Sequence, residues 1–133
     1  MQIVAPIDIE EAVAAEIAEA APTGVGVTAY PPPDNISGVH VAIMSLGSYE
    51  QSEVSDAYDI VAYVWAPTYS EAYENAFGVA GVIRALRFNA KYARFNTSEA
   101  NAPYEDPDPE RQTLRRCTVR ATVGVRGVGM TLQ

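Results

Sequence analysis

The sequence predicts an α+β fold in which two helices pack on one face of a mostly antiparallel sheet of four to five strands. Two observations indicate this fold. Apolar residues recur at helical spacing after Asp8 and after Thr68, and apolar and polar residues alternate from Leu114 to Arg126. The predicted order is helix, three strands, helix, short strand and strand. With 133 residues, of which 48% are hydrophobic, we expect a single domain over residues 1–133.

The first helix is predicted to begin after Asp8, which is a favourable N-cap residue. Glu11 follows three residues later, as in a capping box. An apolar stripe gives the helix one face to bury, and it consists of Ile9, Val13 and Ile17 at four-residue spacing with Ala20 three residues further on. Pro22 is expected to end the helix.

Three strands are predicted between the two helices. A short strand over 25–30 ends at the three prolines 31–33, because proline has no N–H group to donate to a sheet. Residues 39–44 alternate as a second strand, and 49–56 form a loop or hairpin connection. The segment 58–66 is apolar on both faces, so we expect it to be the central strand with both faces covered.

The second helix is predicted to be the longest element. Thr68 and Glu71 form its capping box. Gly78 and Gly81 weaken a helix intrinsically, and we interpret them as places of close approach to the sheet. The apolar stripe repeats at spacings of four, three, four and three and is formed by Ala72, Ala76, Val79, Ile83 and Leu86.

The C-terminal third contains a short predicted strand over 89–95, a long connection over 96–112 and the clearest strand of the chain, 114–126. The connection is rich in proline and acidic residues, and a structureless segment of that length usually has a function. The apolar face of the last strand is predicted to lie in the core and consists of Cys117, Val119, Ala121, Val123 and Val125.

Charge is divided between the two parts of the chain. All nine Lys and Arg residues lie from Arg84 to Arg126, whereas residues 1–83 contain twelve carboxylates and no Lys or Arg. With five carboxylates after residue 83, the charges are −12 and 9 − 5 = +4, which sum to −8. This division predicts head-to-tail association of identical copies, which closes into rings or continues as filaments. The candidate interface residues are Arg84, Arg87, Lys91, Arg94, Arg116 and Arg120 on the basic side, and Glu10, Glu16, Glu50 and Glu53 on the acidic side.

The sequence offers little for catalysis, so we expect no enzyme and no cofactor or metal. His40 is the only histidine, and Cys117 lies on the apolar side of its strand, where packing is the expected role. Neither a phosphate-binding glycine loop nor histidine-rich metal spacing is present. The carboxylates of the long connection are interpreted either as a solvated acidic loop or as a loop that faces a neighbouring subunit or a lumen: Glu105, Asp106, Asp108 and Glu110.

Membrane and nucleic-acid binding are also disfavoured. No apolar run approaches the roughly 18 residues of a membrane span, and residues 1–11 are acidic where a signal peptide is basic. An acidic chain is poorly suited to bind nucleic acid, although it could surround DNA without binding it. The aromatic side chains of the second helix at positions 69, 73 and 77 are interpreted as core or interface before base stacking.

The order of these segments resembles the tail terminator proteins of long-tailed phages, also called neck or tail-completion proteins. The resemblance rests on four segments that span most of the chain: Gly24–Val27 with the prolines 31–33, Val61–Ala66 with Glu71, Pro107–Glu110, and the arginine-bearing strand 114–126. It lacks a diagnostic sequence motif. Other head–tail connector or tail tube subunits therefore stay open, as does a small α+β ligand-binding or protein-binding module outside any virion.

The resemblance implies a structural virion protein that forms a ring, typically six-membered, at the head-proximal end of the tail tube. Such a ring stops tube growth and joins the tail to the head connector. The implied partners are further copies of the chain, the tail tube protein and a head–tail connector or stopper protein, with DNA passing without sequence-specific binding. The implied location is the neck region of the virion tail, after assembly in the host cytoplasm.

Overall fold

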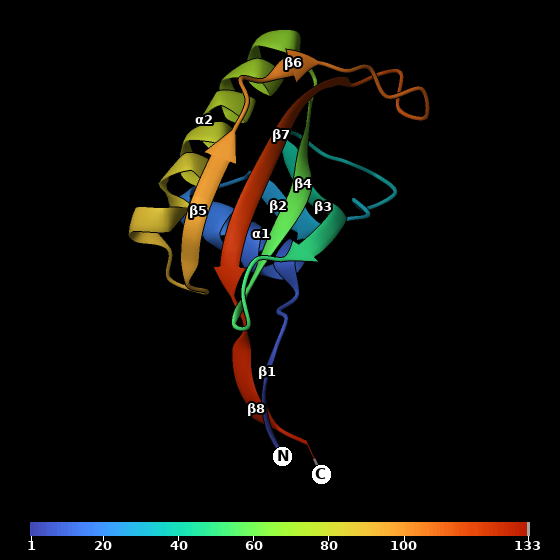
Figure 1. Cartoon of the computed structure of the whole chain (residues 1–133). Helices are drawn as coiled ribbons and strands as arrows, with labels where there is room; N and C mark the ends of the chain where they lie inside the picture. Colours follow the sequence, from blue (N-terminus) through green and yellow to red (C-terminus); the bar gives the residue numbers. More distant parts are fainter. Residues whose placement is uncertain (133) are drawn as a thin grey trace.

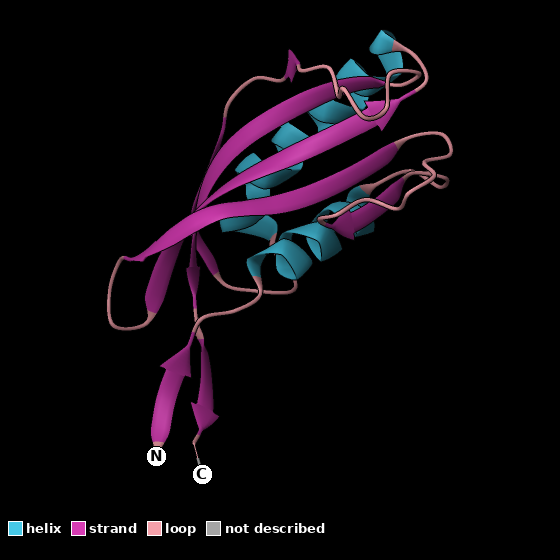
Figure 2. Cartoon of the chain, turned by 90° about the vertical axis from the view of Figure 1, so that its right-hand side faces the viewer, coloured by secondary structure: helices cyan, strands magenta, loops and turns pink. Residues whose placement is uncertain are grey.

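The computed structural model describes residues 1–132 and shows an α+β fold (Figure 1). The elements in chain order are β1 (Gln2–Ala5), α1 (Ile9–Ala20), β2 (Gly26–Ala29), β3 (His40–Glu50), β4 (Ser55–Ala66), α2 (Tyr69–Asn89), β5 (Phe95–Ala100), β6 (Tyr104–Glu105), β7 (Arg115–Arg126) and β8 (Val128–Thr131). Both helices cover the same face of the main sheet (Figure 2). The predicted fold class is therefore confirmed.

The main sheet has six strands in the order β2-β3-β4-β7-β5, with β6 added beside β7. Only β2 and β3 pair in parallel, and the remaining pairs are antiparallel. The predicted central strand is indeed central, because β4 pairs with β3 on one side and β7 on the other. The twelve residue pairs between β4 and β7 run from Ser55–Arg126 to Ala66–Arg115 and set the register of the sheet.

The core lies between this sheet and the two helices. All five residues that the alternation of the last strand assigned to the core are buried in it. They face the apolar stripes of α1 and α2. These stripes bury the predicted residues except Ala20, which is exposed at the end of α1, and they also bury Ala14, Glu16 and Ala80. Both predicted N-caps form, since Asp8 and Thr68 each accept a hydrogen bond of 3.3 Å from the N–H three residues later.

The interpretation of the two helix glycines is wrong. Gly78 and Gly81 lie on the exposed side of α2, away from the sheet. A Cβ atom added to either would meet no heavy atom within 4 Å. Packing inside the subunit therefore gives no reason for a glycine at either position.

The region after α2 differs from the prediction. The helix continues to Asn89, and the strand lies at Phe95–Ala100 instead of 89–95. The segment 96–112 is not structureless, because it contains most of β5 and all of β6. The residues of β5 have weak intrinsic strand preference, but Phe95 and Ser98 are buried and the strand is held by its pairing with β7.

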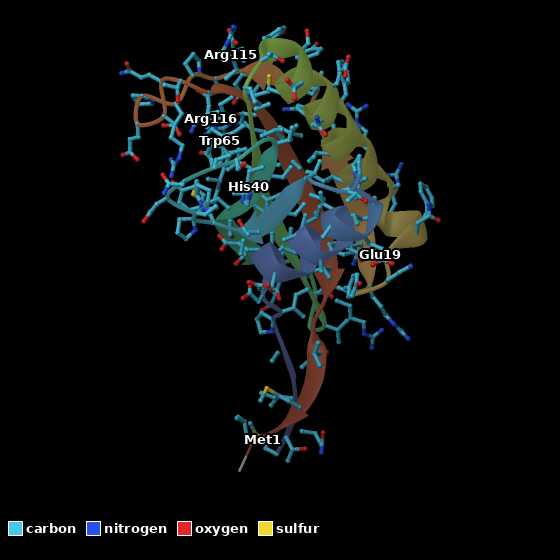
Figure 3. All side chains as sticks on the ribbon, turned by 180° about the vertical axis from the view of Figure 1, so that it is seen from behind. Met1, Glu19, His40, Trp65, Arg115 and Arg116 are labelled. Carbon is cyan, nitrogen blue, oxygen red and sulfur yellow. The ribbon has the colours of Figure 1, made fainter. Side chains whose placement is uncertain are left out.

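The connection predicted over 49–56 is a hairpin, but its strands are longer than predicted. The strands β3 and β4 extend to a turn at residues 51–54, with a bulge between Ser45 and Gly47. Gly47 has φ of 147°, a backbone conformation that favours glycine. The ends of the chain pair as a separate ribbon, β1–β8, which projects from the sheet with Met1 at its far end (Figures 1 and 3).

We predict that Ile83→Ala lowers the free energy of unfolding by about 2 to 5 kcal/mol, because Ile83 is 0% exposed beneath the sheet. Glu74→Ala, on the exposed side of the same helix, is the control and is expected to cost under about 0.5 kcal/mol. Urea denaturation of both variants measures the difference. Equal effects would mean that the burial assigned to the two sides of α2 is wrong.

Candidate functional site

The predicted basic stripe does not form one continuous surface. Arg84 and Arg87 lie on α2, whereas Lys91 and Arg94 follow its end. Arg84 donates from Nε and Nη2 to the carbonyl oxygen of Ala100 at 2.9 and 2.8 Å. The guanidinium of Arg87 lies 4.8 Å from the centroid of the neighbouring Phe88 ring.

Lys91 forms an ion pair of 2.8 Å with Glu19 of the same chain. The two groups favour their charged forms in each other's presence: hydrogen bonding to Glu19 raises the pKa of Lys91, and hydrogen bonding to Lys91 lowers the pKa of Glu19. Tyr92 donates to the second oxygen of the Glu19 carboxylate at 3.0 Å. This cluster joins α1 to the segment after α2, and sequence spacing gave no indication of it.

Two predicted acidic interface residues act inside the subunit. Glu16 is 6% exposed, and its carboxylate accepts hydrogen bonds of 2.9 to 3.0 Å from the backbone N–H groups of Lys91 and Tyr92. The prediction that Glu16 meets a neighbouring copy is therefore wrong. Glu10 accepts a hydrogen bond of 2.7 Å from the N–H of Ser45 and remains partly accessible. By contrast, Glu50 and Glu53 are exposed at the β3–β4 hairpin.

The acidic connection is held against the face of the sheet that the helices leave open. Asp108 is 6% exposed and accepts hydrogen bonds from Trp65 Nε1 at 2.9 Å and from Arg111 Nη1 at 3.2 Å. Trp65 itself is 1% exposed. Asp108 therefore faces neither a lumen nor a neighbour, whereas Glu110 is exposed. The second face of the central strand is covered here, as predicted.

Arg116 joins the same cluster from β7. Its guanidinium lies 4.6 Å from the ring centroid of Tyr63 and donates from Nε to the carbonyl oxygen of Asp106 at 2.7 Å. The Asp106 carboxylate also accepts from Thr118 at 3.0 Å. Figure 3 shows Arg116 beside Trp65 at the end of the sheet that also holds Arg115. Arg116 thus stabilises the subunit, and its 15% exposed side chain offers little to a partner.

These contacts set the pKa of Asp108. Burial alone raises the pKa of this carboxyl. Hydrogen bonds from the Glu110 N–H, Trp65 and Arg111 lower it, as does the charge of Arg116. Together these contacts outweigh burial, so the pKa of Asp108 lies below its ordinary value. Nearby, burial and the charge of Arg111 lower the pKa of His40, which lies 2.9 Å from the Thr28 hydroxyl.

The remaining predicted residues lie at the surface. Glu105 forms an ion pair with Arg115. Arg120 lines an open hollow of about 370 Å³ on the helix-free face of the sheet. The other residues around this hollow are Leu46, Asp59, Ile60, Glu99, Asn101, Ala121 and Thr122. Its charges are mixed and Asp59 is already hydrogen-bonded to Thr122 at 2.9 Å, so the hollow has no arrangement typical of catalysis.

The surroundings of Cys117 are not those of a catalytic nucleophile. Cys117 is 0% exposed, and burial raises the pKa of its thiol, which keeps it protonated.

Within residues 1–132, no three His, Cys, Asp or Glu side chains gather closely enough to hold a metal ion. In the same part of the chain, neither helix has the length and apolar character needed to cross a membrane.

An aromatic row lies on α2 outside the core. Tyr69 and Tyr73 have ring centroids 5.3 Å apart, and Tyr73 and Phe77 have centroids 4.7 Å apart. Tyr73 packs against the edge of the core, whereas Tyr69 is 39% and Phe77 50% exposed. The guanidinium of Arg115 lies 5.3 Å from the centroid of the Tyr69 ring.

No protein-family model matches the sequence, and comparison with curated proteins finds no match. Among solved structures, the fold is similar to that of a chain in the virion of a native gene transfer agent (GTA) particle. The TM-score is 0.62 at 15% sequence identity, and the similarity covers 90% of this chain and 95% of that chain. The two chains therefore share a fold over nearly their whole lengths.

We predict that Asp108→Asn lowers the free energy of unfolding by about 1 to 3 kcal/mol at neutral pH, because it removes the charge that Trp65, Arg111 and Arg116 surround. The folded pKa of Asp108 is depressed, so its contribution is complete above the unfolded pKa of about 3.9 and is lost as the pH falls through the folded pKa.

Urea denaturation at neutral pH and below about pH 4 tests this, since the difference between the natural protein and Asp108→Asn should shrink in acid. Glu110→Gln, at an exposed carboxylate two residues away, is the matched control and should cost under about 0.5 kcal/mol at either pH. A difference between the natural protein and Asp108→Asn that is independent of pH would contradict the role given to the Asp108 charge.

Proposed function

We propose that this chain is a structural virion protein, the subunit of a ring at the head-proximal end of a tail tube. The ring stops growth of the tube and joins the tail to the head connector. The observation that carries the proposal is the similarity in fold, over 90% of this chain, to a chain of a gene transfer agent virion. The order of elements that resembles tail terminators points in the same direction.

Charge and surface support assembly from identical copies. Opposite charges are exposed on different elements of one subunit, with Glu50 and Glu53 at the β3–β4 hairpin and Arg84 on α2. Large apolar side chains are exposed on α2, on the β3–β4 hairpin and on the terminal ribbon, including Phe88 at 74% and Tyr49 at 59%. Contacts between different surfaces of identical copies close into rings, and we propose six copies.

The net charge of −8 per copy suits a channel for DNA. A ring of acidic subunits repels phosphate, so DNA can pass through it without being held. The partners in this proposal are further copies of the chain, the tail tube protein and the head–tail connector or stopper protein. The proposed location is the neck of the virion tail, reached after assembly in the host cytoplasm.

We predict that particles made without this chain have tail tubes longer than normal and heads that are not joined to tails. The physical reason is that the tube end stays open to further subunits and lacks the surface that binds the connector. Electron microscopy of particles from cells that lack the gene measures tube length and the fraction of joined heads. Supplying the natural chain in trans is the control and should restore both. Tails of normal length joined to heads in its absence would refute the proposed function.

A further inference from the structure

We propose that neighbouring copies bind through the exposed face of α2 on one subunit and the tip of the β3–β4 hairpin on the next. The inference rests on the proposed ring and names the two surfaces that build it. The helix face consists of Phe77, Gly81, Arg84 and Phe88, and the hairpin tip of Tyr49, Glu50 and Glu53.

Two exposed phenylalanines lie in line along the helix face. Phe77, Gly81, Arg84 and Phe88 follow one another at spacings of four, three and four, which places them on one side of α2. This side is opposite to the six residues that α2 buries against the sheet. Phe77 is 50% and Phe88 74% exposed. Two exposed phenylalanines in line on a helix are the kind of anchor that protein interfaces bury.

Gly81 adds a second reason. It costs the helix about 1 kcal/mol relative to alanine, and an added Cβ atom would meet no heavy atom within 4 Å. Packing inside the subunit therefore does not compensate for this cost. A partner backbone that approaches the helix closely at Gly81 would do so, because no side chain stands there between Phe77 and Arg84.

The turn of the hairpin is anchored to neighbouring segments. Val54 accepts a hydrogen bond of 2.8 Å from the N–H of Gly127, and Ser55 accepts one of 3.2 Å from Asn96. Beside this turn, Tyr49 is 59% exposed. The tip therefore offers an apolar side chain on a supported hairpin, so binding costs little conformational freedom.

Complementary charge indicates that the hairpin of a second copy binds the helix face. The helix face carries Arg84, which remains exposed while it donates from Nε and Nη2 to the carbonyl oxygen of Ala100. The hairpin segment 46–56 contains three carboxylates and no Lys or Arg. Another exposed apolar element, the β1–β8 ribbon, has no charged side chain within its strands and so offers nothing to this arginine.

The two surfaces occupy different parts of the molecule. In Figure 1, α2 runs along the upper left of the sheet, whereas the turn between β3 and β4 lies at the lower end, above the ribbon. A contact between two different surfaces is heterologous, so every copy binds one neighbour with each and the series can close into a ring.

The test uses one variant for each surface. Gly81→Glu places a bulky carboxylate on the helix face, where it blocks close approach and repels the acidic hairpin. Its subunit should remain folded and equally or more thermally stable, because the site has free space and glycine is the weaker helix former. Glu50→Arg combined with Glu53→Arg inverts the charge of the hairpin tip. Asp34→Arg, at an exposed position outside both surfaces, is the control.

Sedimentation and native mass measurement, with and without purified tail tubes, give the result. Each surface variant alone should lose self-association and ring formation by about tenfold or more, and the control should not. A mixture of the two should form at least 1:1 pairs, because the intact helix face of one variant can bind the intact hairpin of the other.

Oligomers of unchanged size and affinity in either surface variant would overturn the proposed contact while leaving the ring in place. Variants that lose association but form no 1:1 pairs on mixing would also overturn it, since the two surfaces would then not bind each other. A natural chain that assembles neither in solution nor on tubes would instead end the proposed ring itself.

Discussion

The pairing of β4 with β7 is the interaction on which the rest of the structure depends. Twelve residue pairs fix which side of each strand faces the helices, and a shift by one residue would move the buried side chains of β7 into solvent. Both helices use the same face of the sheet. The opposite face must therefore be covered by irregular segments or be left for another molecule, and the protein does both.

At the end of the sheet near Trp65, the protein covers its own second face. Asp108 and Arg116 bring the acidic connection onto the aromatic side chains of β4, so a segment that is rich in charge becomes part of the subunit. At the other end, near the β3–β4 hairpin, the sheet stays open and apolar side chains are exposed. The subunit therefore covers its second sheet face at one end and leaves it open at the other, and the gene transfer agent virion contains a chain of similar fold.

The sequence correctly predicted those features of the fold that depend on the residue pattern of a single helix or strand. The alternation from Cys117 to Val125 and the stripe of α2 placed the core correctly, since each depends on the period of a single element. The contacts of Asp108 with Trp65 and of Glu16 with Lys91 join residues 43 and 75 positions apart, which no spacing rule reaches. The β1–β8 ribbon was missed for the same reason, because its two short strands come from opposite ends of the chain. For the candidate site, charge indicated the acidic hairpin and Arg84, and the aromatic spacing indicated Phe77. The exposure of Gly81 and Phe88 on the same side of α2 required the structure.

The most direct test of the proposed role is electron cryomicroscopy of intact particles that contain this chain, at a resolution that traces the backbone. If the chain closes the tail, its two-helix, six-stranded fold will appear as one closed ring between the last layer of the tail tube and the head connector. Density for this fold repeated along the tube, in the head shell, or absent from the particle would contradict the role proposed for it.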